Sequence, residues 1–97
     1  MAKLYMLVYS DAAGSREEIK SWADKSPLIR TWRYDLPHCI YLVSDVETAA
    51  ELNEDFKGKV GTKGRHLFVE VNDNRQGWLT SDTWYFMRHK TPKPKAK

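Results

Sequence analysis

The sequence predicts an α+β domain in which two helices cover one face of a four-stranded antiparallel sheet. Four hydrophobic segments have the two-residue alternation of β-strands, and two segments carry apolar residues at the three- and four-residue spacing of amphipathic helices. Their order is strand, helix, strand, strand, helix, strand, which is the order of the ferredoxin-like βαββαβ sandwich. We expect one such domain over residues 1–89, including a short C-terminal helix or extension.

The first strand and the first helix are the most clearly marked elements. Lys3–Ser10 is hydrophobic on both of its alternating faces, as expected of a strand that is covered on both sides. Ser15 and Glu18 have the spacing of a capping box, and the apolar stripe after them predicts a helix over residues 16–25. Pro27 is expected to prevent its continuation.

The rest of the chain is arranged around a predicted hairpin at residues 28–45. Leu28–Tyr34 and His38–Ser44 have the composition of its two strands. Asp35 lies between them and is a residue type that turns favour. Cys39 is expected to be a small buried hydrophobe and not a reactive thiol.

The second half of the chain predicts a helix, a strand and a terminal helix. A helix is expected over residues 45–56, with Ser44 as its N-cap and Gly58 as its end. His66–Asn72 alternates as a fourth strand, and Asp82–His89 is expected to form a short last helix.

One face of this sheet is predicted to have no helical cover. Both long helices are expected on the other face, and yet the first strand is apolar on both of its sides. An apolar face without cover predicts either a second copy of the chain or a ligand that lies on it.

The positive charge of the chain is concentrated at its end. Four of the 16 Lys and Arg residues lie in residues 90–97, so residues 1–89 hold 12 basic against 13 acidic side chains. We expect residues 90–97 to be a disordered basic tail, and the near-neutral remainder to attract nucleic acid only weakly.

Composition also limits the class of protein. A single cysteine excludes an internal disulfide and favours a reducing, cytoplasmic setting. No apolar run approaches the roughly 20 residues of a membrane span, so no membrane partner is expected. The histidines His38, His66 and His89 lie in unrelated stretches without a second ligand at helical spacing, which predicts neither a metal site nor a cofactor.

Two groups of residues are candidates for binding. Arg30, Trp32 and Arg33 interleave cations with an aromatic ring in the second strand, a pattern that favours a nucleic acid or a protein partner. Ordinary cross-strand pairing explains the same pattern equally well. Lys63 and Arg65 lie in a basic glycine-rich loop that lacks the spacing of a phosphate-binding P-loop.

Four stretches together resemble a known family over Leu4–Trp84. They are LYMLVYS, TWRYDLPHCIYLVSD, HLFVEVND and GWLTSDTW. The chain resembles the SinR-like branch of the small ferredoxin-fold family that includes the second CRISPR-associated protein and virulence-associated protein D. The resemblance implies a homodimer built through sheet edges and C-terminal segments, for which Tyr9, Trp78 and Trp84 are the candidate interface residues.

The same resemblance raises an alternative activity, that of a metal-dependent endonuclease acting on RNA or DNA. It implies a metal-binding carboxylate at the end of the first strand, with a divalent ion as the only cofactor. Here Ser10 stands at that position and Asp11 follows it, so a carboxylate would point to the opposite face unless a bulge intervenes. Asp11 is the candidate catalytic residue under this alternative alone.

We therefore expect a small dimeric binding module rather than an enzyme. Its candidate partners are nucleic acid or a host protein, contacted through the Arg/aromatic strand.

Overall fold

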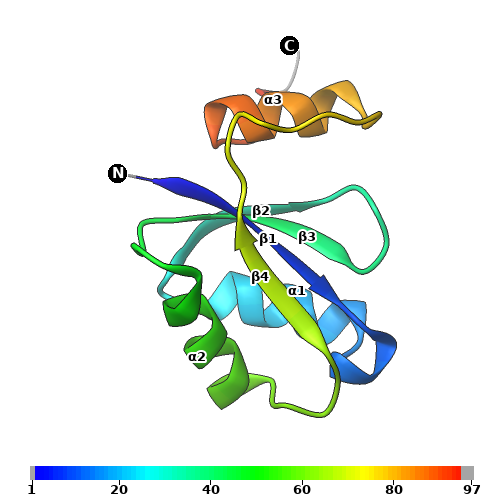
Figure 1. The fold of residues 1–97 in the computed structure, drawn as a ribbon, viewed down its shortest axis with the longest axis vertical. Coiled ribbons are helices and arrows are strands. Elements are labelled where there is room, and N and C mark those ends of the chain that lie inside the picture. Colours follow the sequence, from blue (N-terminus) through cyan, green and yellow to red (C-terminus); the bar gives the residue numbers. More distant parts are fainter. Residues whose placement is uncertain (1, 95–97) are drawn as a thin grey trace.

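The computed structural model describes residues 2–94 and confirms the predicted ferredoxin-like α+β fold with a C-terminal helix (Figure 1). The sheet has the strand order β2-β3-β1-β4, and all neighbouring strands are antiparallel. The elements are β1 (Lys3–Tyr9), a 3-10 turn (Asp11–Ala13), α1 (Arg16–Lys25), β2 (Ile29–Tyr34), β3 (Cys39–Ser44), α2 (Ala49–Lys59), β4 (His66–Glu70) and α3 (Ser81–His89).

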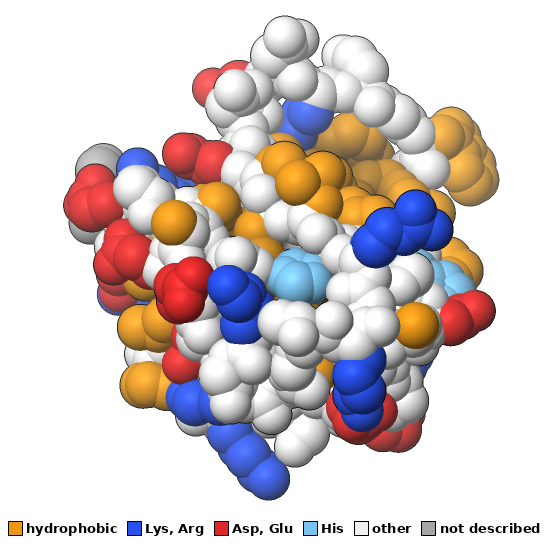
Figure 2. Space-filling model, turned by 60° about the horizontal axis from the view of Figure 1, so that its bottom comes forward, with side chains coloured by type: hydrophobic (Ala, Val, Ile, Leu, Met, Phe, Trp, Pro, Cys, Tyr) orange, Lys and Arg blue, Asp and Glu red, His pale blue; other side chains and the backbone are white. Residues whose placement is uncertain are grey.

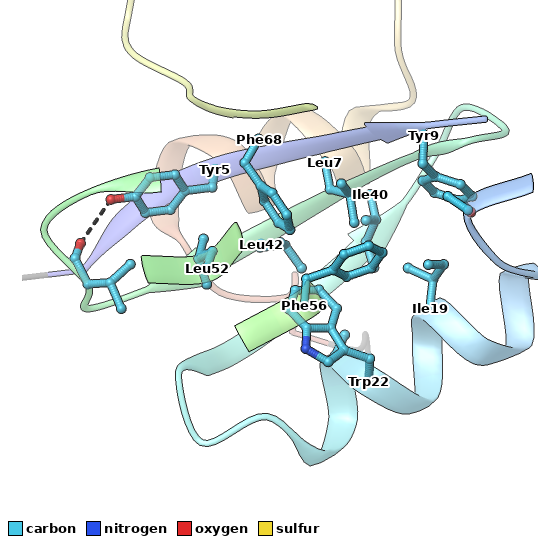
Figure 3. Close-up of a cluster of buried hydrophobic side chains, with 13 residues drawn as sticks. Tyr5, Leu7, Tyr9, Ile19, Trp22, Ile40, Leu42, Leu52, Phe56 and Phe68 are labelled. Atoms are coloured by element: carbon cyan, nitrogen blue, oxygen red, sulfur yellow. Dashed lines mark hydrogen bonds between the residues drawn. The ribbon is translucent and has the colours of Figure 1, made fainter. Parts of the chain in front are cut away.

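Helices α1 and α2 pack on one face of the sheet and enclose the larger core (Figure 3). Phe56 of α2 lies at its centre, with its ring against those of Trp22 from α1 and Phe68 from β4. Tyr5 is also fully buried, and its hydroxyl donates a hydrogen bond of 2.9 Å to the carbonyl of Val46. That bond satisfies the one polar atom that this large side chain brings into the core.

The first helix begins as predicted. The Ser15 hydroxyl accepts a hydrogen bond from the Glu18 amide at 3.1 Å, and the Glu18 carboxylate accepts one from the Ser15 amide at 2.9 Å. Two amides that the first turn leaves free are thus satisfied.

The second helix begins four residues later than predicted. Ser44 is buried at the end of β3, where its hydroxyl donates to the Leu28 carbonyl at 2.6 Å and accepts from Val46. Because these bonds use its side chain, Ser44 does not cap α2. The carboxylate of Glu51 accepts from the Thr48 amide at 3.1 Å instead, and the helix continues through Gly58.

The second face of the sheet is covered, contrary to the expectation from sequence. Figure 1 shows α3 on the side opposite α1 and α2. Phe86 and Met87 of α3 pack against Leu4, Tyr41 and neighbouring strand residues in a second, smaller core. The terminal helix therefore covers apolar residues of the sheet face that was expected to be covered by a second copy or a ligand. Part of this face stays exposed.

A polar latch fixes the first turn of α3 to the β2–β3 hairpin. One carboxylate oxygen of Asp35 accepts from the Thr80 amide at 3.1 Å, the Thr80 hydroxyl at 3.0 Å and the Thr83 hydroxyl at 2.6 Å. Arg33 donates to the Thr83 hydroxyl at 2.7 Å. Asp35 thus caps a helix that begins 46 positions away and does not merely complete its turn.

The latch should make stability depend on pH. The hydrogen bonds, that from Thr83 foremost, hold the pKa of Asp35 below its usual value. Because this pKa is lower in the folded state, the Asp35 carboxylate stabilises the fold at pH values above its unfolded-state pKa of about 3.9. This stabilisation is lost as pH falls through the folded-state pKa.

We expect Asp35→Asn to lower the free energy of unfolding by about 1 kcal/mol near pH 7, because hydrogen bonds to a charged acceptor are stronger than those to a neutral amide oxygen. Urea unfolding should show a smaller difference at pH 3 than near pH 7, because the contribution of the carboxylate is lost as pH falls below the unfolded value and through the lowered folded-state pKa. An equal difference at both pH values would contradict the latch.

The end of the described chain stays near α3. Lys90 has a positive φ of 56° and closes the helix, and the ammonium of Lys93 lies 3.6 Å from the carboxylate of Asp82. Lys95 and Lys97, the last cations of the predicted basic tail, lie outside the described residues. Across residues 2–94, no helix has the length and apolar character needed to cross a membrane.

Candidate functional site

An open groove lies where β1 and β4 meet the connection to α3. We call it the linker groove; it has a volume of about 560 Å³. Met6 and Val69 form its floor, Leu79 and Trp84 form its far wall, and Arg75 stands among the polar residues of its rim. Apolar walls with a few polar groups at the rim are typical of sites that bind an apolar side chain of a partner.

The connection between β4 and α3 forms this groove because of its local hydrogen bonds. The Val71 amide still donates to the Leu4 carbonyl at 2.8 Å, so the chain leaves the sheet only after this residue. The side-chain oxygen of Asn72 then accepts from the Asn74 amide at 2.9 Å, and Arg75 donates to the Asn72 carbonyl at 3.0 Å. This turn directs the chain across the sheet face and leaves an open space beneath it.

The apolar floor of the groove continues to an exposed surface. Val8 and Leu67 pair across β1 and β4 on the same side of the sheet as Met6 and Val69, and they are 40% and 58% exposed. Trp78 in the linker is 94% exposed. In Figure 2, hydrophobic side chains gather in the upper part of the view, where the linker and α3 lie.

Two groups at the base of the groove, the Tyr41 hydroxyl and the neighbouring Cys39 thiol, are held in their neutral forms. Burial raises the pKa of Tyr41, at the base of the groove, to about 12, so its hydroxyl stays neutral. Burial likewise raises the pKa of the neighbouring Cys39 thiol, which keeps it in the unreactive protonated form.

The three residues of the Arg/aromatic strand do not share one surface. A register shift between Ile29 and Thr31 makes Arg30 the extra residue of a β-bulge, and its guanidinium lies 3.1 Å from the Asp45 carboxylate. Trp32 faces α1, where its indole donates to Asp24 at 2.7 Å. Arg33 faces α3 and belongs to the latch.

The basic loop before β4 is held against the end of β1. The Ser10 amide donates to the Arg65 carbonyl at 2.9 Å, and the Arg65 amide donates to the Ser10 hydroxyl at 3.1 Å. Gly64 packs so closely that a Cβ there would lie 2.2 Å from the Ala13 amide nitrogen. Lys63 and Arg65 are exposed on this loop, away from Arg30 and the latch.

Asp11 lies in the 3-10 turn after β1, not in the strand. Its carboxylate is exposed and contacts Nε2 of His38 from the hairpin. A carboxylate and an imidazole are fewer ligands than a protein metal centre usually supplies. Among the described residues, no three His, Cys, Asp or Glu side chains come together as such a centre would need.

The candidate interface residues fall in different environments. Tyr9 is buried beneath α1, where its hydroxyl shares a 2.7 Å hydrogen bond with that of Tyr34. Burial and this bond raise the pKa of Tyr34. Trp84 is half-buried in the wall of the linker groove. Trp78 is exposed one position before Leu79, which also lines the groove, so two of the three belong to the segment that forms this surface.

Sequence reasoning did not identify the residues that form the groove floor and its extension. They are Met6, Val8, Leu67 and Val69. The signal was present as the alternation of Leu67, Val69 and Val71, but alternation does not show which of them the terminal helix leaves uncovered.

Comparisons with protein-family models, with curated proteins and with solved structures gave no match to this chain.

Proposed function

We propose that this chain is a small, non-catalytic protein-binding module that acts as a homodimer and holds an apolar side chain of its partner in the linker groove. The observation that carries the proposal is a 94% exposed tryptophan, Trp78, one position before Leu79, which lines an open apolar groove. Tryptophan is enriched among the residues that dominate binding energy at interfaces, and an exposed apolar patch on a small domain is commonly an interaction site.

A protein partner is favoured over nucleic acid by the state of the cations. Arg30 is paired with Asp45, and Arg33 is hydrogen-bonded within the latch. Residues 1–89 carry 12 basic against 13 acidic side chains, so little long-range attraction for phosphate remains. The groove itself offers apolar walls, neutral amide side chains and one side chain of each charge, Glu70 and Arg75, which suit a polypeptide.

The homodimer and the relationship to the SinR-like branch are part of the same proposal. They are supported by the ferredoxin-like fold and by the resemblance over Leu4–Trp84. The metal-dependent endonuclease is the lesser alternative, because the contact of Asp11 with His38 brings together two possible ligands, and no group of three is found among residues 2–94.

Peptides selected on the immobilised protein from a random phage-displayed library would test the groove. We expect the selected peptides to carry an aromatic or large aliphatic anchor. Trp78→Ala should weaken their binding about tenfold or more, because a central interface tryptophan often contributes at least 2 kcal/mol. The dissociation constants can be measured by fluorescence anisotropy.

Leu36→Ala is the matched control, since Leu36 is also exposed, at 47%, but lies on the β2–β3 turn. It should bind the same peptides as the wild type. Equal affinity of both variants would overturn the groove as the site. Retardation of RNA or DNA at low salt would point to nucleic acid instead, and magnesium-dependent cleavage lost in Asp11→Ala would support the nuclease.

A further inference from the structure

We infer that the homodimer forms when the free edge of β4 pairs with the same edge of a second copy, antiparallel and centred on Phe68. The two four-stranded sheets would then form one continuous sheet. This inference rests on the proposed homodimer and specifies the surface through which it forms.

The outer edge of β4 has unpaired backbone groups. β4 is the last strand in the order β2-β3-β1-β4, so only one of its sides is bonded. On the β1 side, the Arg65 carbonyl accepts from the Ser10 amide, and the Val71 amide donates to the Leu4 carbonyl. Because these bonds alternate along an antiparallel strand, the amides and carbonyls of His66, Phe68 and Glu70 point outward.

The two edges of the sheet differ in how they are protected. Edge strands are usually protected by bulges, charged side chains or proline. β2 has such protection, because its bulge places the exposed, charged Arg30 at the edge. β4 has no bulge, lysine or proline within His66–Glu70, its one carboxylate is that of Glu70 at the end of the strand, and its Leu67 is 58% exposed.

One register uses every outward-facing group of β4. With Phe68 opposite the Phe68 of the second copy, His66 lies opposite Glu70, and all three outward-facing residues can exchange paired hydrogen bonds. A shift by two residues removes strand residues from the pairing. A shift by one residue places helix-side residues opposite residues of the other face.

The side chains in this register are complementary on both faces. On the helix side, an imidazole is opposite a carboxylate, and no like charges are opposed. On the other side, Leu67 is opposite Val69 of the second copy, so the most exposed aliphatic side chain of the strand becomes covered. The covered strip adjoins the linker groove, whose floor includes Val69.

The helix beside this edge leaves room for a second strand. A shallow hollow of about 250 Å³ runs between α2 and β4, and the α2 residues that line it are Ala49, Ala50 and Asn53. Ala49 and Ala50 have short side chains, and the side-chain oxygen of Asn53 lies 2.6 Å from Nε2 of His66 within the same chain, so the hollow offers space for the second copy to approach β4.

Cysteine cross-linking tests the register directly. In it, Leu67 and Val69 of the two copies form a non-hydrogen-bonded pair with Cα atoms about 4.5 Å apart, within the range of a disulfide. Two Leu67 residues, or two Val69 residues, would be about 8 Å apart, which is too far. A refolded mixture of Leu67→Cys and Val69→Cys should therefore give a disulfide-linked dimer on oxidation, and each variant alone should not.

The native Cys39 is buried, so the wild-type protein serves as the background control. Leu67→Lys should weaken the dimer at least tenfold, as measured by light scattering over a concentration series, and Leu36→Lys should leave it unchanged. A lone 11.3 kDa particle at all concentrations would overturn both the homodimer and this interface. A stable dimer whose mixed cysteines fail to cross-link would overturn the β4 register alone and leave the homodimer standing.

Discussion

Phe56→Ala should lower the free energy of unfolding by about 3–5 kcal/mol, the range found when a buried phenylalanine is truncated. Phe56 is fully buried, and its ring centroid lies 5.0 Å from that of Trp22 and 5.7 Å from that of Phe68. Removing the ring leaves a cavity between α1, α2 and the sheet that none of these elements can fill alone. Urea unfolding followed by circular dichroism measures the change.

Phe56→Leu is the control, because it retains most of the apolar volume. We expect it to cost on the order of 1–1.5 kcal/mol. If the alanine and leucine variants were equally stable, the aromatic cluster at this site would not be the centre of the core.

Phe86→Ala should also cost about 3–5 kcal/mol, although it lies in the short C-terminal helix. Phe86 is buried against the sheet face that α1 and α2 do not cover. Its loss would weaken the contact that covers Leu4, Tyr41 and Val43. The free energy of unfolding from urea denaturation is the measurement, and a single transition would show that α3 unfolds together with the sheet.

Tyr85→Ala provides the comparison within the same helix. Tyr85 is half-buried and its ring lies 4.2 Å from that of His89, also in α3, so its truncation should cost about 1 kcal/mol or less. A small effect of Phe86→Ala, equal to that of Tyr85→Ala, would mean that α3 does not cover this face in solution.

The elements with strong local signals were predictable from sequence. The capping box at Ser15 and Glu18 formed as expected, because its partners are three residues apart. The start of α2 was not predictable in the same way. Ser44 and Thr48 are both residue types that cap helices. The Ser44 hydroxyl bonds to the Leu28 carbonyl instead, a contact that exists only once the hairpin has folded.

The position of α3 on the sheet could not be predicted from local sequence patterns, for a similar reason. Sequence patterns indicated a last helix, but Asp35 joins Thr83 across 48 positions, and such a contact has no periodic signal. Once α3 lies on the sheet, most of the face that the sequence left bare is covered. Only the strip of β1 and β4 beyond the reach of α3 remains open.

The β-bulge at Arg30 changes the interpretation of β2 as a single binding surface. Strict alternation places Arg30 and Trp32 on the same face of β2. The bulge at Arg30 interrupts this alternation before Thr31. Trp32 and Arg33 are adjacent in the regular part of the strand and point to opposite sides of the sheet, toward α1 and α3. The exposure of Trp78 could not be predicted from a sequence pattern, because a single aromatic residue in a connecting segment has no periodicity.

The central place of β1 in the sheet also determines when the protein can fold during its synthesis. β1 leaves the ribosome first, yet its two neighbours, β3 and β4, are separated from it by about 30 and 60 residues of nascent chain. The strand must therefore wait until β4 has been synthesised before both of its sides are bonded. During that interval its hydrophobic side chains are accessible to the chaperones that bind emerging chains.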